Sequence, residues 1–216
     1  MGGRAGAVLG VAAAVLAAMP SAADEPGLSL AAARAAFDDR DYVGARELAQ
    51  PLAESGDAGA QTLLGVLHRS GMLGLADRDQ AAEWFKLAVA QGDAEAEFNL
   101  GLMYYQREAR PPQRPATAGA YQAAAAANFG AAAEHGHPMA QLYLGHMVAA
   151  GIGVDPDPVE GYKWYQLAAW QRVDLAVAAL DRLSTIMSAA ELEEARTRAS
   201  RFRARLVAVR EETPGP

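Results

Sequence analysis

The chain contains no cysteine, so it has no disulfide bonds, no thiol nucleophile and no attachment point for a lipoprotein anchor. Aromatic residues make up only 7% of its 216 residues. Alternating β-branched segments, which mark strands, are rare, and Asn-Gly hairpin turns are missing. Stability must therefore come from burial of apolar side chains, and the alanine-rich composition predicts an all-α protein.

A long apolar segment occurs only at the start of the chain. Arg4 is followed by an apolar run of 15 residues, Ala5 to Met19, and Ser21-Ala22-Ala23 places small residues where a signal peptidase cleaves. The run is shorter than the roughly 20 residues that cross a bilayer. We therefore expect a signal peptide over residues 1–23, cleaved between Ala23 and Asp24, although a retained anchor is the alternative. The protein is expected to be periplasmic or secreted, without stable membrane insertion after cleavage.

Positive charge is scarce, with 19 Lys and Arg against 26 Asp and Glu. The formal net charge of −7 argues against nucleic acid and against anionic membrane surfaces as main partners. Proteins are the partners that the composition leaves open.

A Leu-Gly pair recurs three times, each time with an alanine four residues before the leucine. The spacing between copies is 36 and then 44 residues, and the sets are Ala60 with Leu64-Gly65, Ala96 with Leu100-Gly101, and Ala140 with Leu144-Gly145. Phe85, Phe129 and Tyr165 each lie seven residues before the second turn position of their copy, which is Gly92, Gly136 or Arg172. The recurrence indicates a repeat array.

Each copy has the pattern of two helices joined by a glycine-containing turn. Glycine costs about 1 kcal/mol relative to alanine inside a helix, so Gly65, Gly101 and Gly145 indicate close helix contact. Asp77 and Asp157 are suited to N-cap second helices. The predicted first helices are Ala60–Arg69, Ala96–Gln106 and Ala140–Ala150, and the second helices are about Asp79–Gln91, Thr117–His135 and Val159–Gln171.

The third copy resembles the Sel-1-like repeat, a relative of the tetratricopeptide repeat. Its Leu144-Gly145, Gly151-Ile152-Gly153-Val154, Asp157 and Trp164-Tyr165 all fall at the positions of that pattern. The resemblance implies an α-solenoid over residues 24–187, with a degenerate copy at about 28–57 and further copies at about 58–93, 94–137 and 138–173.

Residues 188–216 have the pattern of an amphipathic capping helix and tail. Ser188 and Glu191 form a capping box, and apolar residues recur at three- and four-residue steps, at Leu192, Ala195, Ala199, Phe202, Leu206 and Val209. This helix is expected to cover the end of the solenoid, although its arginines Arg196, Arg198, Arg203 and Arg205 also suit an acidic partner. The segment Met187 to Leu192 resembles the tail of exported bacterial members of the family.

Eight extra residues lie within Gln106 to Ala118 in the middle copy, and they include Pro111, Pro112 and Pro115. Surface insertions cost little free energy. We interpret the segment as a loop at one edge, in preference to a functional lid.

The sequence predicts neither catalytic residues, nor a metal site, nor a cofactor. His135 and His137 flank Gly136 without the further ligands that zinc requires, and the motifs of serine hydrolases, zincins and P-loops are missing. A binding scaffold is therefore favoured. The alternative is a cell-wall-acting or β-lactam-binding enzyme of the same repeat family, although the β-lactam-binding relatives are rich in cysteine.

In related arrays the first helix of each pair lines the concave side, so the resemblance implies a partner-binding surface there. The positions just before and just after the Leu-Gly pairs vary between copies. They are Leu63, Asn99 and Tyr143 before, and Val66, Leu102 and His146 after. Core packing is an equally good interpretation of Leu63, Val66 and Leu102, whereas Asn99, Tyr143 and His146 are more costly to bury.

Export can be tested by N-terminal sequencing of the protein taken from its native compartment. The sequence should begin at Asp24, because Ser21-Ala22-Ala23 directs cleavage after Ala23. Full-length protein in the cytoplasm would contradict this prediction.

Overall fold

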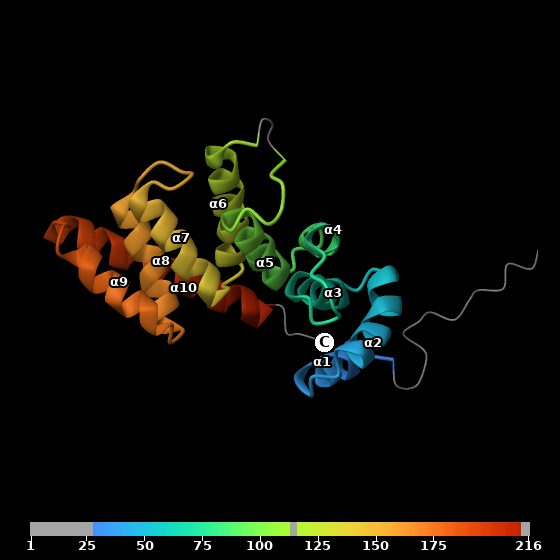
Figure 1. The fold of residues 1–216 in the computed structure, drawn as a ribbon. Coiled ribbons are helices and arrows are strands. Elements are labelled where there is room, and N and C mark those ends of the chain that lie inside the picture. The colour runs from blue at the N-terminus through green and yellow to red at the C-terminus, as the bar shows by residue number, and fades with distance from the viewer. Residues whose placement is uncertain (1–27, 113–115, 213–216) are drawn as a thin grey trace, which may run out of the picture.

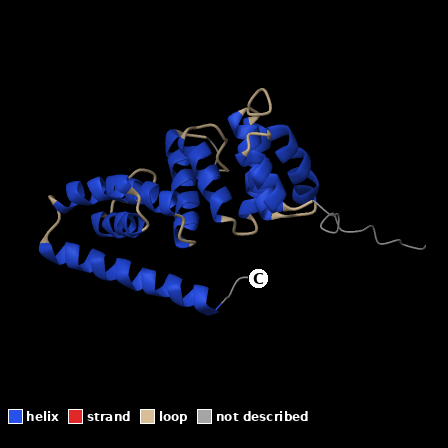
Figure 2. Cartoon of the chain, turned by 90° about the horizontal axis from the view of Figure 1, so that it is seen from below, coloured by secondary structure: helices blue, strands red, loops and turns tan. Residues whose placement is uncertain are grey.

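The computed structural model describes residues 28–112 and 116–212, and these residues form ten helices and no strand (Figure 2). The predicted signal peptide at residues 1–23 lies outside them. The helices are α1 (Leu30–Asp38), α2 (Tyr42–Glu54), α3 (Ala58–Ser70), α4 (Arg78–Val89), α5 (Ala94–Tyr105), α6 (Ala118–Glu134), α7 (Pro138–Ala150), α8 (Pro158–Trp170), α9 (Asp174–Ser184) and α10 (Ala189–Glu212). The all-α prediction is confirmed.

The helices pack as consecutive pairs, α1–α2, α3–α4, α5–α6 and α7–α8, and each pair packs against the next. Figure 1 shows the pairs following one another from α1 to α9. The observed bounds of α3 to α8 lie within two residues of the predicted helices. The predicted solenoid of helix-turn-helix repeats is therefore confirmed.

Short polar side chains and turn glycines set the helix ends as predicted. Asp77 Oδ1 accepts the Gln80 N–H at 2.9 Å, and Asp157 Oδ1 accepts the Glu160 N–H at 2.9 Å. The turn after α6 has its left-handed residue at Gly136, with φ of 86°. Arg172 keeps the same conformation after α8, with φ of 65°, although a side chain there costs about 1 kcal/mol.

Within each pair, the glycine of the first helix faces an aromatic ring of the second. A Cβ added at Gly65 would lie 2.5 Å from the Phe85 ring. The same atom at Gly101 would lie 2.8 Å from Phe129, and at Gly145 it would lie 2.8 Å from Tyr165. Close contact therefore accounts for a glycine inside each of these helices.

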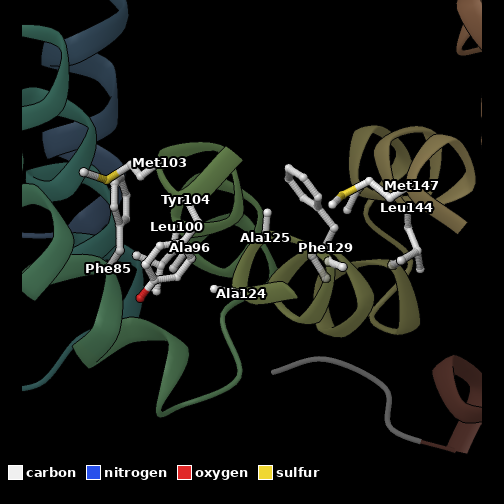
Figure 3. Packing of buried hydrophobic residues seen from close by; sticks show 14 of the residues in the cluster. Phe85, Ala96, Leu100, Met103, Tyr104, Ala124, Ala125, Phe129, Leu144 and Met147 are labelled. Atoms are coloured by element: carbon white, nitrogen blue, oxygen red, sulfur yellow. The ribbon is translucent and has the colours of Figure 1, made fainter. Parts of the chain in front are cut away.

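The aromatic residues at these contacts belong to the core that joins the pairs. Phe85 and Phe129 are fully buried and share one apolar cluster with Met103 and Met147 (Figure 3). The second cluster lies between α1, α2 and α3, and the third joins α8 to α9 and to the start of α10. Burial therefore continues along the array.

The last helix of the array, α9, begins like another first helix. Ala176 lies 36 residues after Ala140 and is fully buried. However, the position that corresponds to Gly145 is Asp181, which is exposed. A carboxylate at that position prevents a second helix from approaching as closely as α8 approaches α7.

The predicted amphipathic C-terminal helix is α10, and its capping box is present. The Ser188 N–H donates to Glu191 Oε2 at 2.7 Å, and the Glu191 N–H donates to Ser188 Oγ at 3.3 Å. The helix packs mainly along the side of α8, while α9 occupies the end of the array. The Phe202 ring meets Trp164 edge-on, with 5.1 Å between ring centres.

The insertion in the middle copy connects α5 to α6 outside the helices. Its described residues are not all exposed, because Ala109 and Pro111 are buried. The Arg107 guanidinium lies 5.8 Å from the Tyr121 ring centre. The part of the loop next to α5 is thus packed against the array.

Two glycine substitutions test the close contacts. Gly101→Ala should lower the free energy of unfolding by about 1–3 kcal/mol, since its Cβ would overlap the Phe129 ring. Gly130→Ala is the matched control in α6, where an added Cβ meets nothing within 4 Å, and it should raise stability by about 0.5–1 kcal/mol. Thermal or urea unfolding measures both. Equal stabilities for the two variants would contradict a close contact between Gly101 and the Phe129 ring.

Candidate functional site

The first helices of the pairs lie on the inner side of the array. α1 contacts α3, α3 contacts α5, and α7 contacts α9, whereas the second helices α2, α4, α6 and α8 approach one another less closely. The backbones of α5 and α7 do not come as near to each other as those three pairs. An array whose first helices are nearer together curves with those helices inside. We call the face formed by α3, α5 and α7 the inner surface.

The six predicted binding residues differ widely in exposure on this surface. Leu63 lies in the core with 8% exposure, so its side chain is not open to a partner. Val66, Leu102 and Tyr143 are half-buried against another apolar cluster, the one that contains Phe85 and Phe129. Asn99 is buried, and His146 is exposed.

Tyr143 belongs to an aromatic cluster between α5, α6 and α7. Its ring stacks on Phe129 with 5.0 Å between centres, and it meets Phe98 and Tyr105 edge-on at 5.9 and 5.8 Å. Tyr105 is 40% exposed. The cluster thus fixes the Tyr143 ring while leaving part of it at the surface.

Asn99 takes part in a chain of polar contacts that crosses the inner surface. Its amide donates to the backbone oxygen and to Oε1 of Glu95, both at 2.9 Å, and its Oδ1 accepts from Arg69 at 3.4 Å. Arg69 also donates to Glu108 at 2.9 Å and to Gln106 at 2.7 Å. The guanidinium therefore ties α3 to α5 and to the start of the insertion.

The chain of contacts ends at the turn between α6 and α7. His137 Nδ1 accepts the Ala140 N–H at 3.1 Å, which places the ring hydrogen on Nε2, 3.0 Å from Glu95 Oε2. The hydrogen bond from His137, together with the Asn99 amide and the charge of Arg34, lowers the pKa of Glu95. Glu95 is therefore ionised at neutral pH and orients both Asn99 and His137.

A second polar link repeats along the array. Gln61 donates to the Ala53 carbonyl at 3.1 Å and accepts from Gln91 at 2.9 Å. Gln141 and Gln171 repeat this arrangement 80 residues later. In the middle copy the same positions hold Glu97 and His135, with 2.9 Å between Oε2 and Nδ1. Among the three described copies of this link, the middle one alone replaces the two glutamines by a carboxylate and an imidazole.

A small pocket of about 240 Å³ opens on the inner surface beside the polar chain. Two of the predicted residues, Val66 and Asn99, line it together with Arg69, Ser70 and Glu108. Over residues 28–112 and 116–212 no three His, Asp or Glu side chains gather at metal-ligand positions. The arrangement offers hydrogen-bond donors and acceptors on an apolar base, which suits recognition of another polypeptide.

Sequence reasoning missed Arg69, Glu95 and Glu108 as parts of this surface. Arg69 and Glu108 are 39 residues apart, and Glu108 lies in the insertion of the middle copy, outside the repeat pattern. Their residue types match no motif. The one available signal was that Glu95 and His137 start the first helices of consecutive copies.

The helix pairs and their inner surface define an α-solenoid of the tetratricopeptide type. A family model described as the Sel1 repeat matches residues 58–93, 94–114 and 138–169. The chain therefore contains Sel1 repeats, and the predicted resemblance is confirmed.

One curated relative and two solved structures are similar to this chain. The chain is 34% identical over 127 residues to chitin synthase regulatory factor 3 of Schizosaccharomyces pombe, which covers 58% of this chain and 13% of that protein. A protective antigen of uropathogenic Escherichia coli with an SLR fold has a TM-score of 0.64 at 22% identity, covering 87% of this chain and 44% of that one. A Sel1 repeat protein of Oxalobacter formigenes has a TM-score of 0.61 at 24% identity, covering 70% and 59%. The two structures support the fold.

Substitution of two arginines that share Glu108 tests the polar chain. Arg69→Met should lower the free energy of unfolding by about 1–3 kcal/mol, because it removes the donor from Glu108 Oε2 and from Asn99 Oδ1, both of which are largely shielded from solvent. Arg78→Met is the control, since Arg78 is 53% exposed and contacts Glu108 at 3.3 Å, and it should cost less than about 1 kcal/mol. Chemical denaturation measures the difference. Equal effects would show that Arg69 is not the centre of the chain.

Proposed function

We propose that this protein is a protein-interaction scaffold or regulator of the bacterial cell envelope, and that it binds a partner protein through the inner surface. The observation that carries the proposal is the arrangement of this surface. Residues whose identity varies between the copies of the repeat are held in place there by their contacts, beside the pocket. Repeat arrays present such surfaces to extended partners. The similarity to a protein named as a regulatory factor supports a regulatory role.

The site that the partner would contact centres on α5 and α7. His146 is exposed and lies three residues after Tyr143, so both face the same side of α7. Tyr143 and Tyr105 supply aromatic surface of the kind that dominates interface hot spots. Val66, Leu102 and Asn99 would complete the surface from α3 and α5, with Leu63 supporting it from the core.

The envelope location is supported by the N-terminal residues. Arg4, the apolar run and Ser21-Ala22-Ala23 have the order of a secretory signal. None of the described helices is long and apolar enough to cross a membrane. An exported scaffold would meet the outer domains of membrane proteins or other envelope assemblies.

In-cell photo-crosslinking from position 146 should capture the partner, because His146 is the exposed residue of the proposed site. The same crosslinker at position 43 is the control, since Val43 is 54% exposed on α2, outside the inner surface. For the captured partner, the double variant Tyr143→Phe with His146→Ala should bind about tenfold more weakly, which is about 1.4 kcal/mol. Phenylalanine keeps the ring stacked on Phe129, so the melting temperature should stay near that of the unaltered protein.

Three results would contradict the proposal. The first is equal capture of the same partner from positions 146 and 43, and the second is unaltered affinity of the folded double variant. The third is a catalytic activity of the purified protein that a single substitution abolishes while the fold is kept.

A further inference from the structure

A groove outside the inner surface runs between the end of α8 and the second half of α10. Its volume is about 220 Å³, and Leu167 and Leu206 form its apolar base. Trp170 and Val207 stand at its edge, 39% and 49% exposed. A neighbouring hollow shares Trp170, Arg203 and Val207, so the groove continues along α10.

The helix beside the groove carries positive charge in an otherwise acidic protein. Residues 195–208 contain five arginines and no Asp or Glu, whereas the whole chain has a net charge of −7. Arg198 pairs with Glu194 at 2.8 Å and Arg205 with Glu134 at 2.6 Å. Within the described residues, Arg196, Arg201 and Arg203 form no ion pair.

Arg203 is the unpaired arginine that belongs to the groove. Its guanidinium lies 5.0 Å from the centre of the Trp170 ring, which positions it by a cation–π interaction. Because the ring does not occupy the N–H donors at the guanidinium edge, a carboxylate can bind them in bidentate fashion. Next to these donors, Trp170 and Val207 offer exposed apolar surface.

We propose that this groove binds an acidic peptide segment of a partner protein, in which Asp or Glu flanks one bulky apolar side chain. The carboxylate pairs with Arg203, and the apolar side chain packs on Trp170, Val207 and Leu206. Arg201, two residues before Arg203 and therefore on the other side of α10, does not line the groove, but its charge adds to the positive potential that attracts the remaining acidic residues. The groove shares no lining residue with the pocket on the inner surface, so it is a second, independent site.

An anionic membrane is a poorer match for the same helix. Interfacial helices bury their apolar face in the lipid headgroup region, but Ala195, Ala199 and Phe202 of α10 are already buried against the protein. A peptide requires only the side of α10 that faces the groove.

Fluorescence anisotropy of a labelled probe peptide tests the proposal with the purified full chain. The probe contains Asp-Asp-Leu-Asp-Asp, and its two counterparts carry Asn for every Asp or Ser for Leu. The acidic probe should bind, and the two counterparts should bind at least about tenfold more weakly. Added salt should weaken the binding of the acidic probe.

Three variants locate the binding. Arg203→Glu and Trp170→Ala should each weaken the acidic probe by about tenfold or more. Arg196→Glu is the matched control on the same helix, two turns from Arg203, and should change the affinity by less than about threefold. Arg203 is exposed on a helix surface, so Arg203→Glu keeps the test decisive if Trp170→Ala does not fold.

Four outcomes would overturn the proposal. They are failure of the acidic probe to bind, equal weakening by Arg196→Glu and Arg203→Glu, binding of phosphatidylglycerol vesicles in place of the probe, and self-association of the chain that Arg203→Glu abolishes. The inner surface is not involved in this test. Failure here is therefore distinguishable from failure of the proposed scaffold function.

Discussion

The contact between a first-helix glycine and a second-helix aromatic ring determines the geometry of every complete repeat. A Cβ added to the glycine of the first helix would lie only 2.5 to 2.8 Å from the facing ring, which is Phe85, Phe129 or Tyr165. Because the interior is close-packed, such an overlap is relieved only by moving one helix relative to the other. The distance within a pair then sets where its turn and its first helix meet the next repeat. The inner surface depends on this spacing, since its polar and aromatic contacts run from one pair to the next.

The same contact explains how the array ends. In α9 the glycine position holds Asp181, and 36 residues after Tyr165 the chain has Arg201 in place of an aromatic residue. Because both the glycine and the aromatic residue of the contact are missing, α10 has no close-packed site on the free side of α9. It packs instead on α8, where Phe202 contacts Trp164. As a consequence, Arg203 comes to lie beside Trp170 and the turn at Gly136.

Features that depend on neighbours in the sequence were predictable from it. The Leu-Gly pairs, the turn glycines and the aromatic residues gave α3 to α8 within two residues, because each feature acts within one helix or one turn. The helix α9 was not delimited, since Ala176 is followed by Leu180-Asp181 and the Leu-Gly signal is lost. The placement of α10 depends on which face of the array is left uncovered, and local patterns do not contain that information.

The exposure of the candidate-site residues could be predicted only in part from the sequence, for a related reason. The positions around the Leu-Gly pairs do face the inner surface, but their exposure depends on side chains from other repeats. Asn99 is buried because Arg69 from the preceding copy covers it, and the two residues are 30 positions apart in the sequence. Tyr143 is half-covered because Phe98 and Phe129 from the middle copy pack against it. His146 has no such neighbour among the contacts of the described residues, so its exposure followed from the pattern alone.

The two surfaces differ in how their charges are satisfied, and this difference bears on what each can contribute to binding. On the inner surface Arg69 already donates to three acceptors, so a partner that competes for these hydrogen bonds must replace them with equally good ones. Such a surface discriminates by shape and by hydrogen-bond geometry. Along α10, Arg201 and Arg203 have no acceptor among the residues that the structure describes. These two charges can therefore attract an approaching carboxylate without first breaking an internal hydrogen bond. Charges of this kind mainly raise the association rate and respond to salt. A single partner that reached both surfaces would be attracted by α10 and selected by the inner surface.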